Sequence, residues 1–349
     1  MKKIMTAMSG GVDSSVAAAL LKEGGYNVCG GTLRLYETEN TPSKEVELAK
    51  SVCDRLEIEH FVYDMRETFL KEVINRFAKE YNDGLTPNPC IECNKYIKFG
   101  ALLENAIKED CAFIATGHYS RIKKDPNSRF VLYRPQDQKK DQTYVLWRLS
   151  QYQLSHILMP LGDITKERVR EIAQDYGFVS ATAKESQDIC FVPDGNYAAF
   201  LEGFIGKPFE KGNYTDISGS VLGKHSGHQC YTIGQRKGLG IALGKPQFVI
   251  SKNPLTNEVV LGDEEHIFKK RIYIKDVNMI ATEMPSSAVA CTAKLRYSAK
   301  DEKCLFHPLS ENEALLEFEK PQRAASPGQS AVFYDVDAVL GGGKIVRGE

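Results

Sequence analysis

The chain has 349 residues, with 45 basic and 46 acidic side chains and a formal net charge of -1 at pH 7. Hydrophobic residues make up 42% of it and charged residues 26%, which excludes disordered, collagen-like and coiled-coil proteins. The even charge balance excludes a protein held on nucleic acid by bulk attraction, so any RNA contact must be a local patch. Nine irregularly spaced cysteines predict reduced thiols and a cytoplasmic protein.

The first part of the chain alternates apolar runs with helical patterns. An apolar run at 4–8, a pair of glycines and an alanine-rich stretch at 16–21 predict a strand, a tight loop and a helix. Further strands are expected near 26–35, 61–63 and 113–116, with helices at 46–56, at 69–78 and after Thr165. This order predicts a doubly wound α/β domain with a mostly parallel sheet that binds ligands at the carboxyl ends of its strands. No apolar run approaches the ~18 residues of a membrane span, so no membrane association is expected.

The character of the chain changes beyond residue 197. Seven glycines between Gly219 and Gly244 predict turns between short strands. Short apolar runs at 271–275, 288–295, 314–318 and 331–334 are separated by Pro, Gly and Ser. These runs predict a small all-β domain, either a sandwich or a barrel.

The glycine loop carries a candidate phosphate site, Ser9-Gly10-Gly11-Val12-Asp13-Ser14-Ser15. Between a strand and a helix, such a loop directs backbone N–H groups at an anion. It lacks the lysine that reaches the β and γ phosphates in the usual nucleoside-triphosphatase loop. This favours release of pyrophosphate over γ-phosphoryl transfer, although an ordinary glycine turn is the alternative. The motif resembles that of the ATP pyrophosphatases, which activate substrates as adenylates.

Two cysteines lie in polar surroundings and are candidate nucleophiles. Cys93 follows Asn88-Pro89-Cys90 and is expected on a loop leading into a helix near Tyr96, where the helix N-terminus and a neighbouring lysine would stabilise its thiolate. Cys190 lies in the segment Gln-Asp-Ile-Cys-Phe. The alternatives are inert loop cysteines, a structural zinc or a redox pair at Cys90 and Cys93, and a metal at 225–230, which we interpret as a turn. Cys29, Cys53 and Cys111 are expected in the core.

Taken together, five motifs resemble the tRNA-specific 2-thiouridylases, the MnmA or TrmU family. They are the phosphate loop, the Asn-Pro-x-x-x-Cys-Asn-Lys and Gln-Asp-Ile-Cys-Phe segments, and the stretches 231–240 and 327–334. The resemblance spans nearly the whole chain. It implies an enzyme that uses ATP to replace the oxygen at carbon 2 of the wobble uridine with sulfur. It also implies an ATP-binding domain at 1–197, a small central domain at 198–268 and a C-terminal β-barrel at 269–349.

The resemblance assigns roles to individual residues. Cys190 would accept sulfur as a persulfide from a donor protein, and Cys93 would act with it to deliver sulfur, leaving a disulfide for a reductant to reopen. ATP, with Mg²⁺, would be bound by Ala7, Met8, Ser9, Gly10, Gly11, Val12, Asp13, Ser14, Leu33 and Gly117. The tRNA would be contacted by Asn88, Pro89, Cys90, His118, Lys140, Asp141, Gln142, Arg296, Tyr297 and Gln329.

Two further expectations concern the RNA and an alternative mechanism. The segment 121–148 holds eight basic residues against three acidic ones and predicts a phosphate track, with a merely solvated hairpin as the alternative. Many members of the family carry Asp where this chain has Cys90. Three cysteines, Cys90, Cys93 and Cys190, could instead hold an iron–sulfur cluster, which would replace the persulfide steps. Another adenylating ligase of the same superfamily would need neither Cys93 nor Cys190.

Overall fold

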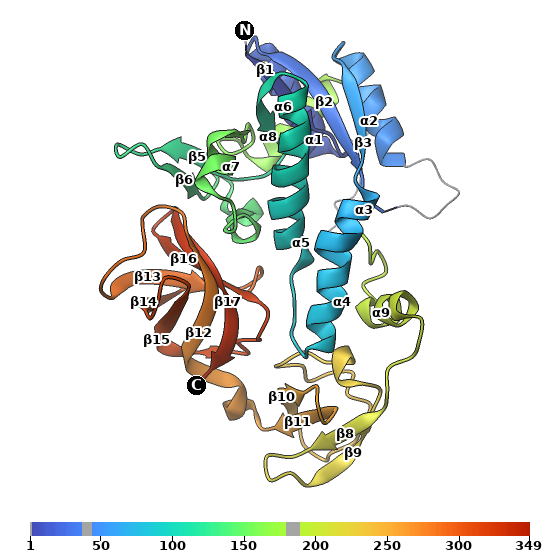
Figure 1. The fold of residues 1–349 in the computed structure, drawn as a ribbon, viewed down its shortest axis with the longest axis vertical. Helices are drawn as coiled ribbons and strands as arrows, with labels where there is room; N and C mark the ends of the chain where they lie inside the picture. The colour runs from blue at the N-terminus through green and yellow to red at the C-terminus, as the bar shows by residue number, and fades with distance from the viewer. Residues whose placement is uncertain (1, 37–43, 179–188) are drawn as a thin grey trace.

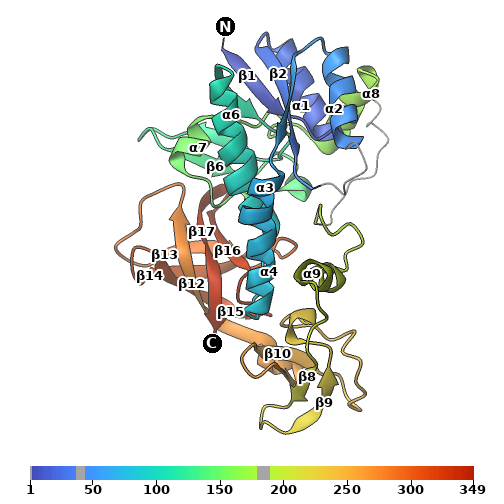
Figure 2. The same cartoon turned by 45° about the vertical axis from the view of Figure 1, so that its right-hand side comes forward.

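The structure is a computed structural model that describes residues 2–36, 44–178 and 189–349. Figure 1 shows an α/β domain at the top, a β-barrel at the lower left and a small sheet at the bottom. Helices connect the top of the molecule to the small sheet at its foot. In both views this helical rod runs alongside the barrel (Figure 2). No helix in the described ranges is long and apolar enough to cross a membrane.

The α/β domain is built on a parallel sheet of five strands in the order β3-β2-β1-β4-β7. Its strands are β1 (Lys3–Ala7), β2 (Asn27–Arg34), β3 (His60–Asp64), β4 (Cys111–Ala115) and β7 (Ile157–Leu158). Its helices are α1 (Val12–Glu23), α2 (Lys44–Arg55), α6 (Leu102–Lys108), α7 (Gln151–Ser155) and α8 (Lys166–Asp175). Alternate strand residues bury on opposite faces, as Met5 packs with α6 while Ile4 packs beside α1. The doubly wound α/β prediction is therefore confirmed.

Two helical arms extend from this sheet. One comprises α3 (Arg66–Phe69), the π-helix η1 (Leu70–Ile74) and α4 (Asn75–Asn82). The other comprises α5 (Pro89–Glu92) and the π-helix η2 (Cys93–Ala101), which continues into α6. After residue 189 the chain forms α9 (Tyr197–Ile205), which packs on the first arm through the stacked rings of Tyr81 and Tyr197, 4.7 Å apart.

The central domain is a four-stranded sheet in the order β10-β11-β8-β9. Its strands are β8 (Gly212–Thr215), β9 (Val221–His225), β10 (Phe248–Asn253) and β11 (Glu258–Gly262), with 3₁₀ turns η6 (His228–Cys230) and η7 (Glu264–Ile267). It abuts the end of α4, where His228 Nε2 lies 3.2 Å from the Asn82 carbonyl oxygen. The glycine-rich stretch forms the predicted turns. Six of its seven glycines have φ between 68° and 114°.

The C-terminal strands close into a six-stranded barrel. They are β12 (Phe268–Met279), β13 (Val289–Lys294), β14 (Glu302–Pro308), β15 (Glu313–Arg323), β16 (Ser330–Asp335) and β17 (Ala338–Gly348). Antiparallel pairing of β12 with both β15 and β17 completes the ring, which selects the barrel over the sandwich. The hairpin β5 (Arg121–Lys124) and β6 (Phe130–Tyr133) belongs to the first domain in sequence but pairs with β17.

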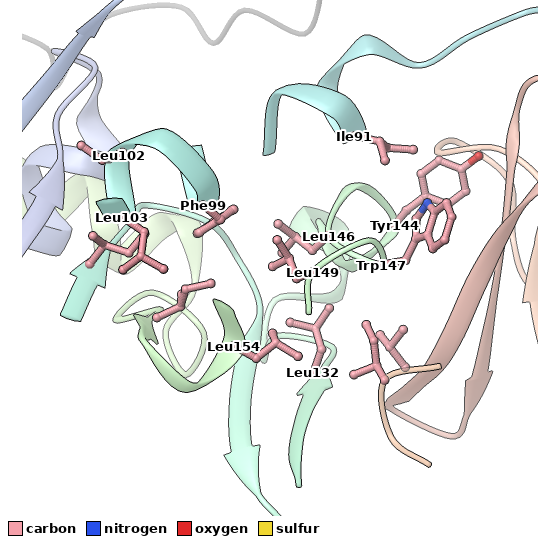
Figure 3. Close-up of a cluster of buried hydrophobic side chains, with 14 of the residues drawn as sticks. Ile91, Phe99, Leu102, Leu103, Leu132, Tyr144, Leu146, Trp147, Leu149 and Leu154 are labelled. Carbon is pink, nitrogen blue, oxygen red and sulfur yellow. The ribbon is translucent and has the colours of Figure 1, made fainter. Parts of the chain in front are cut away.

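A single core joins the α/β domain to the barrel. Figure 3 follows this cluster from Leu102 and Phe99 to Trp147 and Tyr144, beside the barrel strands. Trp147 is fully buried, and its indole Nε1 donates to Ser330 Oγ at 3.0 Å. It lies between the 3₁₀ turns η3 (Gln138–Lys140) and η4 (Thr143–Val145) and helix α7. The barrel is thus held against the α/β domain by buried contacts.

Candidate functional site

The phosphate loop joins β1 to α1 and is closed by its own hydrogen bonds. Gly10 has φ of 73°, and a Cβ there would lie 2.7 Å from Leu48 Cβ, so the turn requires glycine. Ser14 Oγ donates to the Gly11 carbonyl at 3.0 Å and accepts from Ser9 N at 3.3 Å. The predicted strand, loop and helix are confirmed, and the N-terminus of α1 opens at the carboxyl end of β1.

An ion pair lies inside this loop. Asp13 Oδ1 accepts a hydrogen bond from Lys166 Nζ at 2.6 Å and one from Tyr119 OH at 2.8 Å. Gly117, at the end of β4, packs directly on the loop, because a Cβ there would lie 2.8 Å from Ser14 N. The structure therefore brings Gly117 against the phosphate loop. Leu33, the other predicted adenosine contact, is half-buried near the end of β2.

Cys93 lies within a helix, which corrects the prediction that it precedes one. Helix α5 begins at Pro89, and Asn88 is its N-cap, with its Oδ1 accepting from Cys90 N at 3.1 Å. Asn at the N-cap followed by Pro at the first helical position is a strong signal for the start of a helix. Here it outweighs the tendency of Asn and Pro to occur in loops. The helix therefore starts seven residues before Tyr96, and Cys93 begins its π-helical part.

The three candidate thiols share one electrostatic environment. Cys93 is buried, whereas Cys90 and Cys190 are exposed. Burial raises the pKa of the Cys93 thiol to about 12, with Lys98 opposing the shift and the other two thiols adding to it. Desolvation and the Cys90 thiol also raise the pKa of Cys190. The expectation of a stabilised Cys93 thiolate is wrong for this state, because desolvation outweighs the nearby lysine. Residues 184–188 of the Cys190 motif lie outside the described residues.

Among the described residues, Lys98 is the lysine whose charge acts on these thiols. The neighbouring lysine expected from the sequence was Lys95. The charge of Lys98 lowers the pKa of Cys90, Cys93 and Cys190, in each case against desolvation. In a regular α-helix, residues five apart point about 140° away from each other. In the π-helix η2 the repeat is i→i+5, which turns Lys98 toward the face of Cys93. A π-helix has no clear sequence signal, so only the structure could identify this residue.

Glu92, next to Cys93, anchors the cysteine-bearing helix to two other parts of the molecule. Its buried carboxylate binds Arg148 Nη1 at 2.5 and 2.6 Å and lies 3.1 Å from Lys344 Nζ of the barrel. Lys344 also binds Glu80 of α4 at 2.6 Å. Burial lowers the pKa of Lys344, but the two carboxylates outweigh it and raise that pKa above its usual value. These four side chains fix both helical arms to the barrel.

The barrel also contributes residues to the mouth of the site. Gln329 Nε2 donates to the Thr86 carbonyl at 2.9 Å, just before the Asn-Pro-Cys turn. Tyr297 is 44% exposed, its ring centroid lies 6.1 Å from that of Tyr144, and desolvation with nearby Asp141 and Cys90 raises its pKa. The structure therefore brings the predicted tRNA residues of the barrel, Gln329 and Tyr297, to the edge that holds Cys90.

Other predicted tRNA residues lie inside the protein. His118 is buried, its Nδ1 is 2.8 Å from Thr116 Oγ1, and burial lowers its pKa well below the usual value. Asp141 is buried and accepts from Thr143 Oγ1 at 2.6 Å. Gln142 Oε1 accepts from Tyr119 N at 2.8 Å. Lys140 is partly exposed beside them. Their contact with tRNA stays a prediction, and in this state three of them support the fold.

The arginines of the phosphate track predicted at 121–148 form ion pairs within the protein, and their contact with RNA stays a prediction. Arg129 pairs with Glu283, and Arg134 lies 3.1 Å from Asp301 and 4.0 Å from the Tyr334 ring centroid. Arg121 contacts Asp163 and Asp337, and Arg148 contacts Glu92. These charges join the hairpin and its following loop to the barrel. Carboxylates outside the segment therefore pair with its four arginines, which are half of its eight basic residues.

The cysteines predicted in the core and the histidines of the predicted turn have structural roles. Cys29, Cys53 and Cys111 are buried, which confirms the core prediction. His225 and His228 are buried, with His225 Nδ1 accepting from Gly227 N at 3.0 Å, which fits the turn interpretation. Within the described ranges no three His, Cys, Asp or Glu side chains converge as metal ligands. In that arrangement Cys90, Cys93 and Cys190 do not fit an iron–sulfur cluster.

Comparisons with known proteins cover the whole chain. Domain families match it at residues 2–194 (tRNA methyl transferase HUP domain), 198–263 (tRNA methyl transferase PRC-barrel domain) and 269–345 (aminomethyltransferase beta-barrel domain). It is 46% identical to the tRNA-specific 2-thiouridylase MnmA of Lachnoclostridium phytofermentans, over 99% of this chain and 100% of that protein. It is 48% identical to MnmA 1 of Clostridium tetani, over 99% and 96%.

A solved structure with a partial likeness is the U34-tRNA thiolase NcsA from Methanococcus maripaludis, at 20% identity and a TM-score of 0.36 over 58% of this chain and 66% of that one. That score is too low to carry an argument. Family membership rests on the relatives that are 46% and 48% identical over 99% of this chain. The chain belongs to the tRNA-specific 2-thiouridylase family.

Proposed function

We propose that this protein catalyses the ATP-dependent 2-thiolation of the wobble uridine in tRNA. Two observations support the proposal: a phosphate loop at the N-terminus of α1, and three thiols near enough to shift one another's pKa, in a chain 46% identical to a 2-thiouridylase over its full length. The domain families are named for methyl transfer, but methyl transfer would require neither an ATP loop nor paired thiols. A different adenylating ligase would leave the thiols unexplained.

The first step activates the base. The carbon-2 oxygen of uracil attacks the α-phosphorus of ATP, the bond to the β-phosphate oxygen breaks, and pyrophosphate leaves with the electron pair. The loop 7–14 binds the phosphates through backbone N–H groups and hydroxyls, with Leu33 and Gly117 beside the adenosine. We place Asp13 next to the Mg²⁺ that accompanies ATP, since carboxylate oxygens are its preferred protein ligands.

The second step exchanges oxygen for sulfur. The terminal sulfur of a persulfide on Cys190 attacks carbon 2, and AMP leaves with the former carbonyl oxygen. Cys93 then attacks Cys190 Sγ, so that the sulfur stays on the base and a Cys93–Cys190 disulfide forms, which a dithiol reductant reopens. Exposure of Cys190 suits it to meet a donor protein, and burial of Cys93 suits it to act later. No step is assigned to an iron–sulfur cluster.

We propose that the tRNA binds on the surface where the barrel meets the α/β domain and the cysteine-bearing helix. The wobble base would be unstacked into the pocket lined by Asn88, Pro89 and Cys90. Arg296 and Tyr297 are exposed on the barrel loop at this edge, with Gln329 and Lys140 beside it. The nine free thiols support a reducing, cytoplasmic setting.

The test is thiolation with purified components. The protein is incubated with ATP, labelled persulfide donor and tRNA, and 2-thiouridine and pyrophosphate are measured by mass spectrometry and enzymatic assay. Cys93→Ser and Cys190→Ser should both lose thiolation, but only Cys93→Ser should still load label on residue 190. Cys230→Ser, in the central domain, is the matched control. Release of ADP and orthophosphate, or equal loading of both variants, would contradict the mechanism.

Cys90→Ser separates the persulfide mechanism from the cluster alternative. The persulfide mechanism uses only Cys93 and Cys190, so anaerobically purified Cys90→Ser should keep most of its thiolation activity without bound iron. Thiolation that requires iron and sulfide and is lost in this variant would overturn the persulfide mechanism.

A further inference from the structure

A buried lysine from a distant helix reaches into the phosphate loop. Lys166 is the first residue of α8, and its ammonium lies 2.6 Å from Asp13 Oδ1, 153 residues away in sequence. Only 3% of its side chain is exposed, against 33% for Asp13. We infer that Lys166 supplies the phosphate-binding cation that the loop itself lacks, and that it binds the pyrophosphate leaving group of ATP. The inference rests on the proposed cleavage between the α and β phosphates.

The position of Lys166 is fixed by the surrounding backbone. Thr165 caps α8, with its Oγ1 accepting from Arg168 N at 3.3 Å. The backbone N–H of Lys166 donates to Asp137 Oδ2 at 3.1 Å. The ammonium also lies 5.7 Å from the centre of the Tyr119 ring. Because the first residue of the helix is held from both sides, its side chain points to a defined place in the loop rather than sampling solvent.

The charge inside the loop requires a cation. The loop otherwise offers neutral donors, the hydroxyls of Ser9 and Ser14 and the backbone N–H groups. Asp13 adds a carboxylate to the first turn of α1, which by itself would repel a triphosphate. Lys166 neutralises that carboxylate in the nucleotide-free protein. When MgATP enters, the ammonium can turn to the phosphate oxygens while the more exposed Asp13 faces the metal ion.

The chemical role follows from where charge develops. As the α-phosphorus is attacked, the bond to the bridging oxygen breaks and negative charge grows on the departing pyrophosphate. A positioned ammonium in a site shielded from water stabilises that charge without any proton transfer. Lys166 of α8 thus plays the part of the loop lysine in the usual nucleoside triphosphatase, but it acts on the leaving group rather than on the transferred phosphate.

Direct binding measurements test this inference independently of thiolation. Pyrophosphate, AMP and ATP are titrated calorimetrically into the full-length protein without divalent metal, for the wild type, Lys166→Met and Asp13→Asn. Arg168→Met is the matched control, because this exposed residue of α8 pairs only one turn away, with Glu171 at 2.8 Å. Lys166→Gln, which keeps a donor for Asp13, is the second variant should Lys166→Met fail to fold.

The expected result is at least tenfold weaker binding of pyrophosphate and ATP to Lys166→Met or Lys166→Gln, with AMP binding within twofold of the wild type. Asp13→Asn should bind pyrophosphate as well as or better than the wild type, since it removes a negative charge from beside the ammonium. Equal weakening in the Lys166 and Asp13 variants would show a purely structural ion pair and overturn the inference, as would unchanged pyrophosphate affinity in a folded Lys166 variant. Failure of the wild type to bind ATP or pyrophosphate would instead contradict the proposed function.

Discussion

Replacing Glu92 with Gln should lower the unfolding free energy by weakening the ion pairs between the barrel and the helix that carries Cys93. Side-chain exposures are 7% for Glu92, 13% for Arg148 and 17% for Lys344, so all three groups are largely desolvated. Removing one partner of a buried ion pair typically costs 3–5 kcal/mol. Gln still accepts a hydrogen bond, and Lys344 keeps Glu80 at 2.6 Å, so we expect a loss of about 2–3 kcal/mol in unfolding free energy.

The assay is thermal and urea unfolding, with thiolation measured below the transition. Glu72→Gln is the matched control, because Glu72 also pairs with an arginine at 2.5 Å, yet that arginine is 44% exposed. It should lose less than about 1 kcal/mol. Arg148→Met combined with Glu92→Gln should lose less than the sum of the single variants. If Glu92→Gln loses no more stability than Glu72→Gln, the coupling of the barrel to the cysteine helix through this cluster is refuted.

Two other substitutions probe the barrel. Gly342→Ala should lower the unfolding free energy by about 1–3 kcal/mol, because the new Cβ would lie 2.6 Å from the Trp147 ring. The control is Gly203→Ala in α9, where a Cβ would have no atom within 4 Å, and thermal unfolding should show it to be neutral or stabilising. Arg296→Ala should weaken tRNA binding several-fold and reduce the slope of log Kd against log salt concentration by about one. Arg347→Ala is the control, because Arg347 pairs with Glu349, and it should change neither quantity. Equal effects of the two variants would contradict the proposed tRNA-binding surface.

Local patterns predicted the α/β domain well because they act over short distances. The expected helix after Thr165 is α8, with Thr165 as its cap and Gly177 at φ of 61° past its end. The glycine loop at Gly10 and Gly11 has the predicted strand and helix on either side. Hydrophobic periodicity and capping are read within one or two turns, so they need no knowledge of tertiary contacts.

The parts that sequence reasoning missed depend on partners far along the chain. The sequence shows the arginines of 121–148 as a local excess of positive charge, but it does not show their partners Glu283, Asp301 and Glu92. In the sequence, Lys166 is an ordinary residue of an amphipathic helix. Its ion pair with Asp13, at 2.6 Å, is visible only in the structure. A charge pattern in the sequence shows only residues that are close along the chain, whereas ion pairs in the folded protein join residues that are close in space. The π-helix at Cys93 is likewise set by tertiary packing.

The raised pKa of Cys93 makes a prediction about when this thiol can react. With a pKa of about 12, only about one thiol in 10⁵ is ionised at pH 7 in the tRNA-free protein, against a few per cent for an ordinary cysteine. Alkylation of Cys93 by iodoacetamide, followed by peptide mass spectrometry, should therefore be slow and rise about tenfold per pH unit between pH 7 and 10.

The same shift has a consequence for stability, because Cys93 holds its proton in the folded protein and releases it near pH 8.5 when unfolded. Its contribution to stability should be complete below that pH and be lost as pH rises toward 12. The control is Cys230, which is partly exposed and should be alkylated faster. A Cys93 rate that levels off near pH 8 or 9 would mean an ordinary thiol and contradict the reasoning. If the prediction holds, burial keeps Cys93 in its unreactive thiol form at neutral pH.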